Sequence, residues 1–416
     1  MKIFKDIRQK YGHLYEWYYI LVIAGYTLTL ISLKVRPGVI AGVLLCLVTL
    51  ELIADRCVST KSFIDKLILF YIGYNILSVI WLHASGMPFS VFIGEFTVSI
   101  FPVVFYFAGK SVGERLPFFY EKFTLAVVFA GVLGIILYIT APQFYIDYSY
   151  DLLFISKADT ATMRVRMNSV VGCTLLGFLG TAGMMTGAFF LGDGGKKEKR
   201  ETRGCLKAVI YIAVCMVTAV MSNQRSSLVT VILVLVFINY LIFFKLELLN
   251  KKYFYIEAGG LVLVLILLCV IKPELLLKIW WRLESLPGAV SERSEQWVAA
   301  VNNMYSTWIG NGLGANGHRA LGIEDAHVIA DGGLVKLYCE EGVIGFSVFL
   351  FIVLNAVKKG LGDIKDFYVE LGLIAVTLLQ SIGSNVIAFQ LAAPIFWFAI
   401  GRINLAEADG EIPDNP

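Results

Sequence analysis

Apolar residues run in long, nearly uninterrupted stretches along most of this chain, separated by short charged or Gly/Pro-containing connections. Each stretch is about as long as a helix that crosses a bilayer, which needs roughly 17 to 25 residues. The expected spans are 17–33, 38–54, 66–82, 89–109, 123–140, 169–191, 207–221, 227–244, 254–271, 333–357, 367–384 and 388–403. The pattern predicts an all-α, polytopic membrane protein of about 12 transmembrane helices, with residues 1–416 forming a single membrane domain.

Composition supports this prediction, because 58% of the 416 residues are hydrophobic and only 16% are charged. Soluble domains of this length do not have such values. The first apolar run is itself membrane-length and lacks an obvious small-residue cleavage site, so we expect it to be retained. The 7 cysteines lie in or beside predicted spans, which disfavours a disulfide framework or a zinc site.

Lys and Arg predict the orientation, because they are retained on the cytoplasmic side of short connections. With the N-terminus inside, the inner segments carry 23 of them and the outer segments carry 11. The basic segment 195–207 then serves as a topology anchor rather than as a nucleic-acid site. Both termini are expected in the cytoplasm, with 405–416 disordered, and two long connections, 141–168 and 272–332, are expected on the outer side.

The larger external loop, 272–332, contains two predicted helices. PELLLKIWWRLESLPG is typical of an amphipathic helix that lies in the membrane interface. In the second, Trp297 begins a series of apolar residues at helical steps, and Arg293 stands one turn before it on the same face. Arg293 either pairs with a nearby carboxylate or lipid phosphate, or offers its planar group of five donors to an anionic substrate.

Other external arginines allow the same two interpretations. Arg225 is the one charge in the tight turn SNQRSS, and Arg164 and Arg166 stand at the outer mouth of the sixth span. Arg282 and Arg319 complete the set in the larger loop. Contact with lipid headgroups explains many such residues, and an anion site is the alternative.

Ionisable residues also gather where the tenth span begins. Asp331 precedes it, Glu340 lies within it, and His327 precedes both in the external loop. Asp331 suits a helix N-cap, and Lys336 with Glu340 suits an i, i+4 ion pair. Alternatively, Asp331, His327 and Glu340 are candidate proton acceptors at the mouth of a cavity.

The segment GLGANG, residues 312–317, has the spelling of a dinucleotide-binding loop. A predicted helix precedes it instead of a strand, so we expect a compact turn and no nucleotide. The chain also lacks H-E-x-x-H, G-x-x-x-x-G-K-[ST] and G-x-S-x-G. We therefore expect no cofactor and no metal.

One functional hypothesis is a twelve-helix secondary transporter. Such a protein is expected to have two similar halves and discontinuous helices at the membrane midplane. The connection ADRCVSTKSFIDK contains the Asp-Arg pair of major facilitator transporters but lacks the glycine and the paired basic residues of that motif.

The other hypothesis rests on a resemblance. The order of MSNQRSSLVT, ERSEQWVAAV, TWIGNGLGANG and ADGGLVKLYCEEGVIGF resembles the C-terminal half of the O-antigen polymerase and ligase superfamily, over roughly 215–350. The resemblance implies a membrane glycosyltransferase similar to the GT-C type. Asp331-Gly332 stands where a ligase-like pattern has histidine followed by asparagine, which favours a polymerase over a ligase.

The resemblance also implies roles and partners. Arg225 and Arg293 would hold the diphosphate of an undecaprenyl-linked oligosaccharide, with Arg166 as a less certain third group. The reaction would join repeat units of O-antigen or a related polysaccharide at the periplasmic face of the bacterial inner membrane, without nucleotide or nucleic acid. A chain-length regulator and a flippase are the protein partners that it implies, beside the membrane lipids.

Overall fold

The computed structural model describes residues 12–31, 37–58, 60–141, 166–192, 202–247, 251–271, 273–284 and 286–405. Within these ranges the regular structure is helical, which confirms the all-α prediction. The connection 141–168, which was predicted to lie on the outer side, is mostly outside the described residues, as are Arg164 and the predicted disordered tail from residue 406 onward.

The helices follow the apolar runs of the sequence closely. In the first half of the chain they are α2 (Leu14–Ile31), α3 (Pro37–Ala54), α4 (Phe63–Leu77), α5 (Val79–Ala84), α6 (Phe89–Ser99), η1 (Phe101–Val104), α7 (Phe105–Ser111), η2 (Gly113–Arg115), α8 (Leu116–Thr140) and α11 (Cys173–Gly192). In the second half they are α12 (Thr202–Met221), α13 (Arg225–Tyr240), η5 (Leu241–Lys245), α14 (Lys251–Ile271), α15 (Pro273–Glu284), α16 (Leu286–Asn302), η6 (His318–Ala320), α17 (Gly333–Gly362), α18 (Ile364–Gly383), η7 (Val386–Ala388) and α19 (Ala393–Asn404).

Seven helices of the described part are long and apolar enough to cross a membrane. They are Phe63–Ala84, Phe89–Ser111, Gly113–Thr140, Cys173–Leu191, Arg225–Lys245, Gly333–Gly362 and Ile364–Gly383. Each of the other five predicted spans also coincides with a helix, but the full number of 12 spans stays a prediction.

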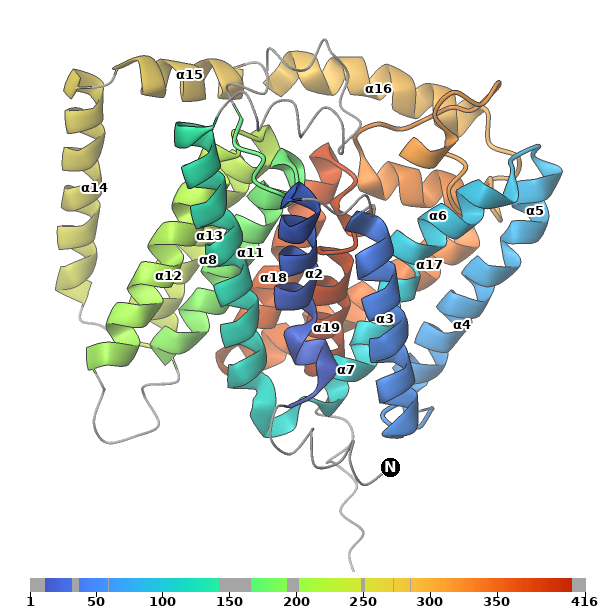
Figure 1. Cartoon of the computed structure of the whole chain (residues 1–416), viewed down its shortest axis with the longest axis horizontal. Coiled ribbons are helices and arrows are strands. Elements are labelled where there is room, and N and C mark those ends of the chain that lie inside the picture. Colours follow the sequence, from blue (N-terminus) through green and yellow to red (C-terminus); the bar gives the residue numbers. More distant parts are fainter. Residues whose placement is uncertain are drawn as a thin grey trace, which may run out of the picture.

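The segment 272–332 forms two helices that lie across one end of the bundle. Figure 1 shows α15 and α16 running roughly perpendicular to the upright helices, from α14 at one edge to the loops that precede α17. The alternation of polar and apolar residues in α15 is typical of a helix that lies in a membrane interface. The helical conformation of both predicted segments is therefore confirmed.

The centre of the bundle is occupied by α19, whose residues are almost all buried. It crosses α7 with the two backbones in contact, because each helix offers a glycine. A β-carbon added to Gly401 would lie 1.9 Å from the carbonyl oxygen of Tyr106, and one added to Gly109 would lie 2.1 Å from that of Phe398. Small residues allow such close helix packing in membranes, and this central pair supports α17 and α18, which carry the candidate site.

Candidate functional site

The first part of the site is an ion pair between α16 and the start of α17. Arg293 Nη2 lies 2.6 Å from Asp331 Oδ2, and the indole nitrogen of Trp297 donates to the backbone oxygen of Asp331 over 2.7 Å. Arg293 and Trp297 are one helical turn apart, so both reach the same neighbour. The sequence prediction that they share a face is confirmed, and the carboxylate that pairs with Arg293 belongs to Asp331, outside α16.

The turn that carries Arg225 comes to the same place. Arg225 begins α13, and Ser226 follows it in the first turn. A β-carbon added to Gly383, the last residue of α18, would lie 3.6 Å from Arg293 Nη1 and 3.6 Å from the Ser226 β-carbon. The end of α18 therefore lies between the guanidinium of Arg293 and the first turn of α13. Two arginines that are far apart in sequence stand on elements that meet at Gly383.

The segment that contains Arg166 packs against this turn. The backbone nitrogen of Met167 donates to the backbone oxygen of Met221 over 2.9 Å, and Gln224 Nε2 donates to Thr174 Oγ1 over 3.0 Å. Half-buried Arg166 thus precedes the residues that fix the Arg225 turn. Three of the predicted diphosphate-binding arginines stand at one end of the bundle, where donors from separate elements can surround an anion.

The remaining predicted residues are Arg319, His327 and Arg282. Arg319 is exposed, and its side chain passes α6, since a β-carbon on Gly94 would lie 3.0 Å from Arg319 Cδ. His327 is exposed, and its backbone oxygen accepts from Asn316 Nδ2 over 2.8 Å. Arg282 belongs to α15, and its side chain is outside the described part of the structure.

The segment 307–312, which precedes α17 and contains two glycines, packs against a break in that helix. This helix is broken at Gly342, where φ is 64° and ψ is −170°. On one side of the break the carbonyls of Cys339 and Glu340 accept from Asn311 N over 2.9 Å and from Gly312 N over 3.0 Å. On the other side Val343 N and Ile344 N donate to Thr307 O over 2.9 Å and Trp308 O over 3.1 Å.

These hydrogen bonds satisfy the backbone N–H and C=O groups that the break in α17 would otherwise leave without partners. Inside a membrane, unpaired backbone groups are costly. Gly312 has φ 89°, and a β-carbon on it would lie 2.6 Å from Leu82 Cβ. The glycines of GLGANG thus serve close backbone packing. The compact turn predicted from the sequence is present, and the segment is built into α17 as part of the bundle.

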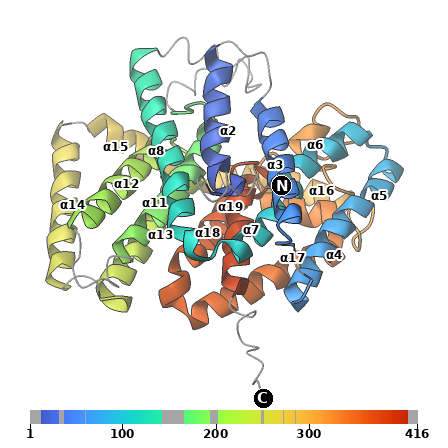
Figure 2. The ribbon, with the colours of Figure 1, turned by 60° about the horizontal axis from the view of Figure 1, so that its bottom comes forward.

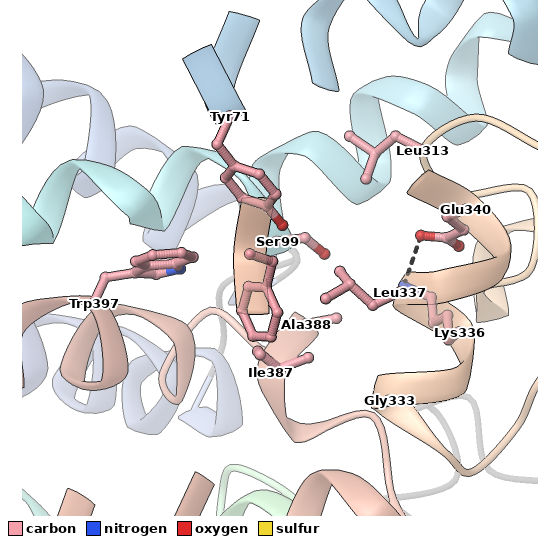
Figure 3. Close-up of a pocket in the computed structure, with 11 residues that line it drawn as sticks. Tyr71, Ser99, Leu313, Gly333, Lys336, Leu337, Glu340, Ile387, Ala388 and Trp397 are labelled. Carbon is pink, nitrogen blue, oxygen red and sulfur yellow. Dashed lines mark ion pairs between the residues drawn. The ribbon is translucent and has the colours of Figure 1, made fainter. Parts of the chain in front are cut away.

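A second charged group lies on the same helix, deep inside the bundle. Lys336 forms an ion pair with Glu95 of α6 and lies 3.3 Å from Glu340 Oε2. Ser99 donates to Glu95 over 2.5 Å, and the backbone nitrogen of Asn316 donates to Glu340 Oε1 over 3.2 Å. Figure 3 shows Lys336 and Glu340 with Ser99 beside a small cavity of about 10 Å³, room for one water molecule.

The predicted i, i+4 pair of Lys336 and Glu340 is therefore confirmed, while Glu95 was missed. Its signal was available, because a single carboxylate within the apolar run FSVFIGEFTVS calls for a partner inside the protein. Tyr71 was missed as well, and it donates to Glu341 Oε1 over 2.6 Å. The carboxylate of Glu340 is 1% exposed and occupied by Lys336 and a backbone donor, which fits a structural role.

One group of described side chains has the composition of a metal site, although no metal was expected. His13, Glu51 and Asp55 place their possible ligand atoms within 4.8 Å of one another. His13 Nδ1 lies 3.5 Å from Glu51 Oε1 and 3.6 Å from Asp55 Oδ2, and Glu51 also accepts from the first amide of α2. These contacts join the segment that precedes α2 to α3.

The end of the bundle with Arg166, Arg225 and Arg293 thus carries three arginines on separate elements that pack against one another. Comparison with protein-family models and with curated proteins finds no match for this chain. The chemistry of the site therefore has to indicate the function. Guanidinium groups from α13, α16 and the segment before α11 suit an anion with several oxygens, such as a diphosphate.

Proposed function

We propose that the protein polymerises undecaprenyl-diphosphate-linked oligosaccharide repeat units into O-antigen or a related surface polysaccharide. The observation that carries the proposal is the meeting of the Arg225 turn and Arg293 at Gly383, at the end of a membrane helix. The donor is an amphiphile whose anionic group lies at the membrane surface. Its diphosphate requires cations at the level where the helices end.

The reaction transfers a glycosyl group between two lipid-linked saccharides. A sugar hydroxyl of one repeat unit attacks the anomeric carbon of the growing chain, and the bond from that carbon to the diphosphate oxygen breaks. The electron pair of this bond goes to the diphosphate, while the hydroxyl proton goes to a base. Fixed guanidinium groups stabilise the charge that develops on the leaving diphosphate.

The ion pair modifies the roles that the sequence suggested. Asp331 holds Arg293 through Oδ2, and Trp297 holds the backbone of Asp331. In this arrangement Asp331 orients the guanidinium, and exposed His327 is the freer candidate for the base. The proposed location is the bacterial inner membrane, with this end facing the periplasm.

Substitution of the two arginines tests the proposal. Arg225→Ala and Arg293→Ala should each abolish long polysaccharide and leave single repeat units, seen on gels from a deletion strain that carries each variant. Exposed Lys358 of α17 provides the control, and Lys358→Ala should give a normal ladder. Normal ladders in both arginine variants, with protein levels equal to wild type, would defeat the proposal.

The same gels separate the polymerase from a ligase, the nearest alternative. Loss of a ligase leaves the lipid A core without polymer while the polymer persists on undecaprenyl diphosphate. Loss of a polymerase leaves at most single repeat units attached. A deletion strain of the first kind would assign the protein as a ligase.

A transporter is the second candidate, and one observation favours it. The break of α17 at Gly342 lies beside the buried charges of Glu340 and Lys336, and discontinuous helices with buried charges are frequent in transporters. The backbone groups at this break are already paired with 307–312, however, which leaves fewer of them for an ion. Accumulation of a solute in vesicles that depends on an ion gradient would support transport.

A further inference from the structure

An apolar groove lies along α18, the helix whose last residue, Gly383, lies beside Arg293. It has a volume of about 360 Å³, within the range of ligand sites. Its floor is α18, with Ala375 and Leu379, and its walls are α13 with Leu233 and α17 with Leu361. Figure 2 shows α18 between these two helices. The side chains that line it are apolar, so a hydrocarbon suits it better than a sugar or an ion.

One exposed face of α18 extends from the groove, whose lining ends at Leu379, to the proposed diphosphate site. Ala375, Leu379 and Ile382 are exposed at helical steps of four and three, and Gly383 follows directly. Arg293 Nη1 and Ser226 lie against Gly383. A ligand with an anionic head at Gly383 would therefore place its hydrocarbon chain along this face and into the groove.

The length of the groove distinguishes between lipids. Its lining extends along α18 from Ile364 to Leu379, which is about 22 Å at the rise of an α-helix. The hydrocarbon core of a bilayer is about 30 Å thick, so one leaflet is about 15 Å. An acyl chain that begins at the arginines ends near the midplane. Only a longer chain reaches the part of the groove near Ile364.

We propose that this groove binds the isoprenoid chain of a long polyprenyl diphosphate whose head lies at Arg225 and Arg293. The inference rests on the proposed function for the identity of the donor, and it adds the place of its chain and a requirement for chain length. The groove selects long-chain lipids, because a short isoprenoid leaves the lining near Ile364 without contacts.

The test uses the full-length protein in nanodiscs and an undecaprenyl diphosphate that carries a photoreactive group at the far end of its chain. Cross-links should map to the far part of the groove, around Leu361 and Ile364. Ala375→Phe fills the groove and should lower this labelling by roughly tenfold, a factor that the loss of about two buried methylene groups already gives. Leu354→Phe is the matched control, because exposed Leu354 of α17 lies outside the groove lining.

Competition supplies the second measurement. Unlabelled undecaprenyl diphosphate should displace the probe at concentrations at which farnesyl diphosphate and inorganic diphosphate do not. Equal labelling of Ala375→Phe and Leu354→Phe would overturn the inference, and so would equal competition by farnesyl diphosphate. Labelling of this site by a photoreactive phospholipid, undiminished by undecaprenyl diphosphate, would identify it as a site for bulk lipid and would also overturn it.

The two proposals fail in different ways. If Arg293→Ala removes polymer while Ala375→Phe retains tail labelling, the groove is excluded and the diphosphate site stands. If tail labelling depends on Ala375 but Arg225→Ala and Arg293→Ala still make polymer, the groove stands and the proposed catalytic role of the arginines is excluded.

Discussion

The first turns of α17 take part in two groups of charged side chains that differ in exposure. In the pair of Arg293 and Asp331 the side chains are 22% and 38% exposed, whereas in the pair of Lys336 and Glu95 both are 5% exposed. A pair in contact with water can exchange a partner for a ligand at little cost. A buried group must keep every partner, because an unpaired charge there is strongly destabilising. The partly exposed pair of Arg293 and Asp331, here called the open pair, is therefore suited to function. The buried pair of Lys336 and Glu95 is suited to holding α6 and α17 together.

Removal of the buried cation should have the largest effect on stability. Lys336→Met leaves Glu95 and Glu340 together in an apolar interior without their cation, which should cost about 3 to 5 kcal/mol. The measurement is thermal unfolding in detergent together with the yield of monodisperse protein. Lys358→Met, on the exposed face of α17, is the control. An unchanged melting temperature for Lys336→Met would show that the ion pairs of Lys336 with Glu95 and Glu340 do not stabilise the contact between α6 and α17.

The break in α17 provides the next prediction. In Gly310→Ala the new β-carbon would meet Glu340 O at 2.3 Å and Gly342 N at 2.6 Å, and φ is already +75°. Displacing the 307–312 segment should destabilise by about 2 kcal/mol or more. Gly322→Ala is the matched control, because φ is +86° there and a β-carbon would meet nothing within 4 Å. Equal melting temperatures for the two variants would mean that the contact with α17 adds nothing to backbone strain.

The hydrogen bond of Tyr71 should have a smaller effect. Tyr71→Phe leaves Glu341, which is completely buried, without the hydroxyl that reaches Oε1 over 2.6 Å. An unsatisfied buried polar group costs about 1 to 3 kcal/mol. Half-exposed Tyr240 allows a control, and Tyr240→Phe should leave thermal unfolding unchanged. Equal stability of both variants would indicate that Glu341 is satisfied in another way.

The sequence predicted the residues around the open pair better than those around the buried pair of Lys336 and Glu95, for a physical reason. Arg293 and Trp297 share a face because they are one helical turn apart, and short-range periodicity contains this information. The apolar runs located the helices for the same reason. Periodicity does not identify the partner that a side chain meets on another helix or loop. Asp331 was therefore expected as a base or a cap and was found holding Arg293.

The buried region depends on long-range contacts that a single sequence does not reveal. Glu95 and Lys336 are 241 positions apart, and Tyr71 and Glu341 are 270 apart. An ionisable residue in an apolar run shows that a partner is needed but does not identify it. The break at Gly342 was also missed, because EEGVIG, residues 340–345, has the pattern of an ordinary helix and only the contact with 307–312 reveals the break.

The smallest expected change in stability separates the two roles of Asp331. Its pair with Arg293 is partly exposed, so Asp331→Asn and Asp331→Ala should each change the free energy of unfolding by no more than about 1 kcal/mol. Their effects on polymer length should differ. If Asp331 orients Arg293, asparagine still accepts a hydrogen bond from the guanidinium, and Asp331→Asn should keep a shortened ladder that Asp331→Ala loses. If Asp331 is the base, an amide cannot take the proton, and both variants should stop at single repeat units. Ladders from equal amounts of the two proteins therefore decide whether the open pair works through the arginine or through the carboxylate.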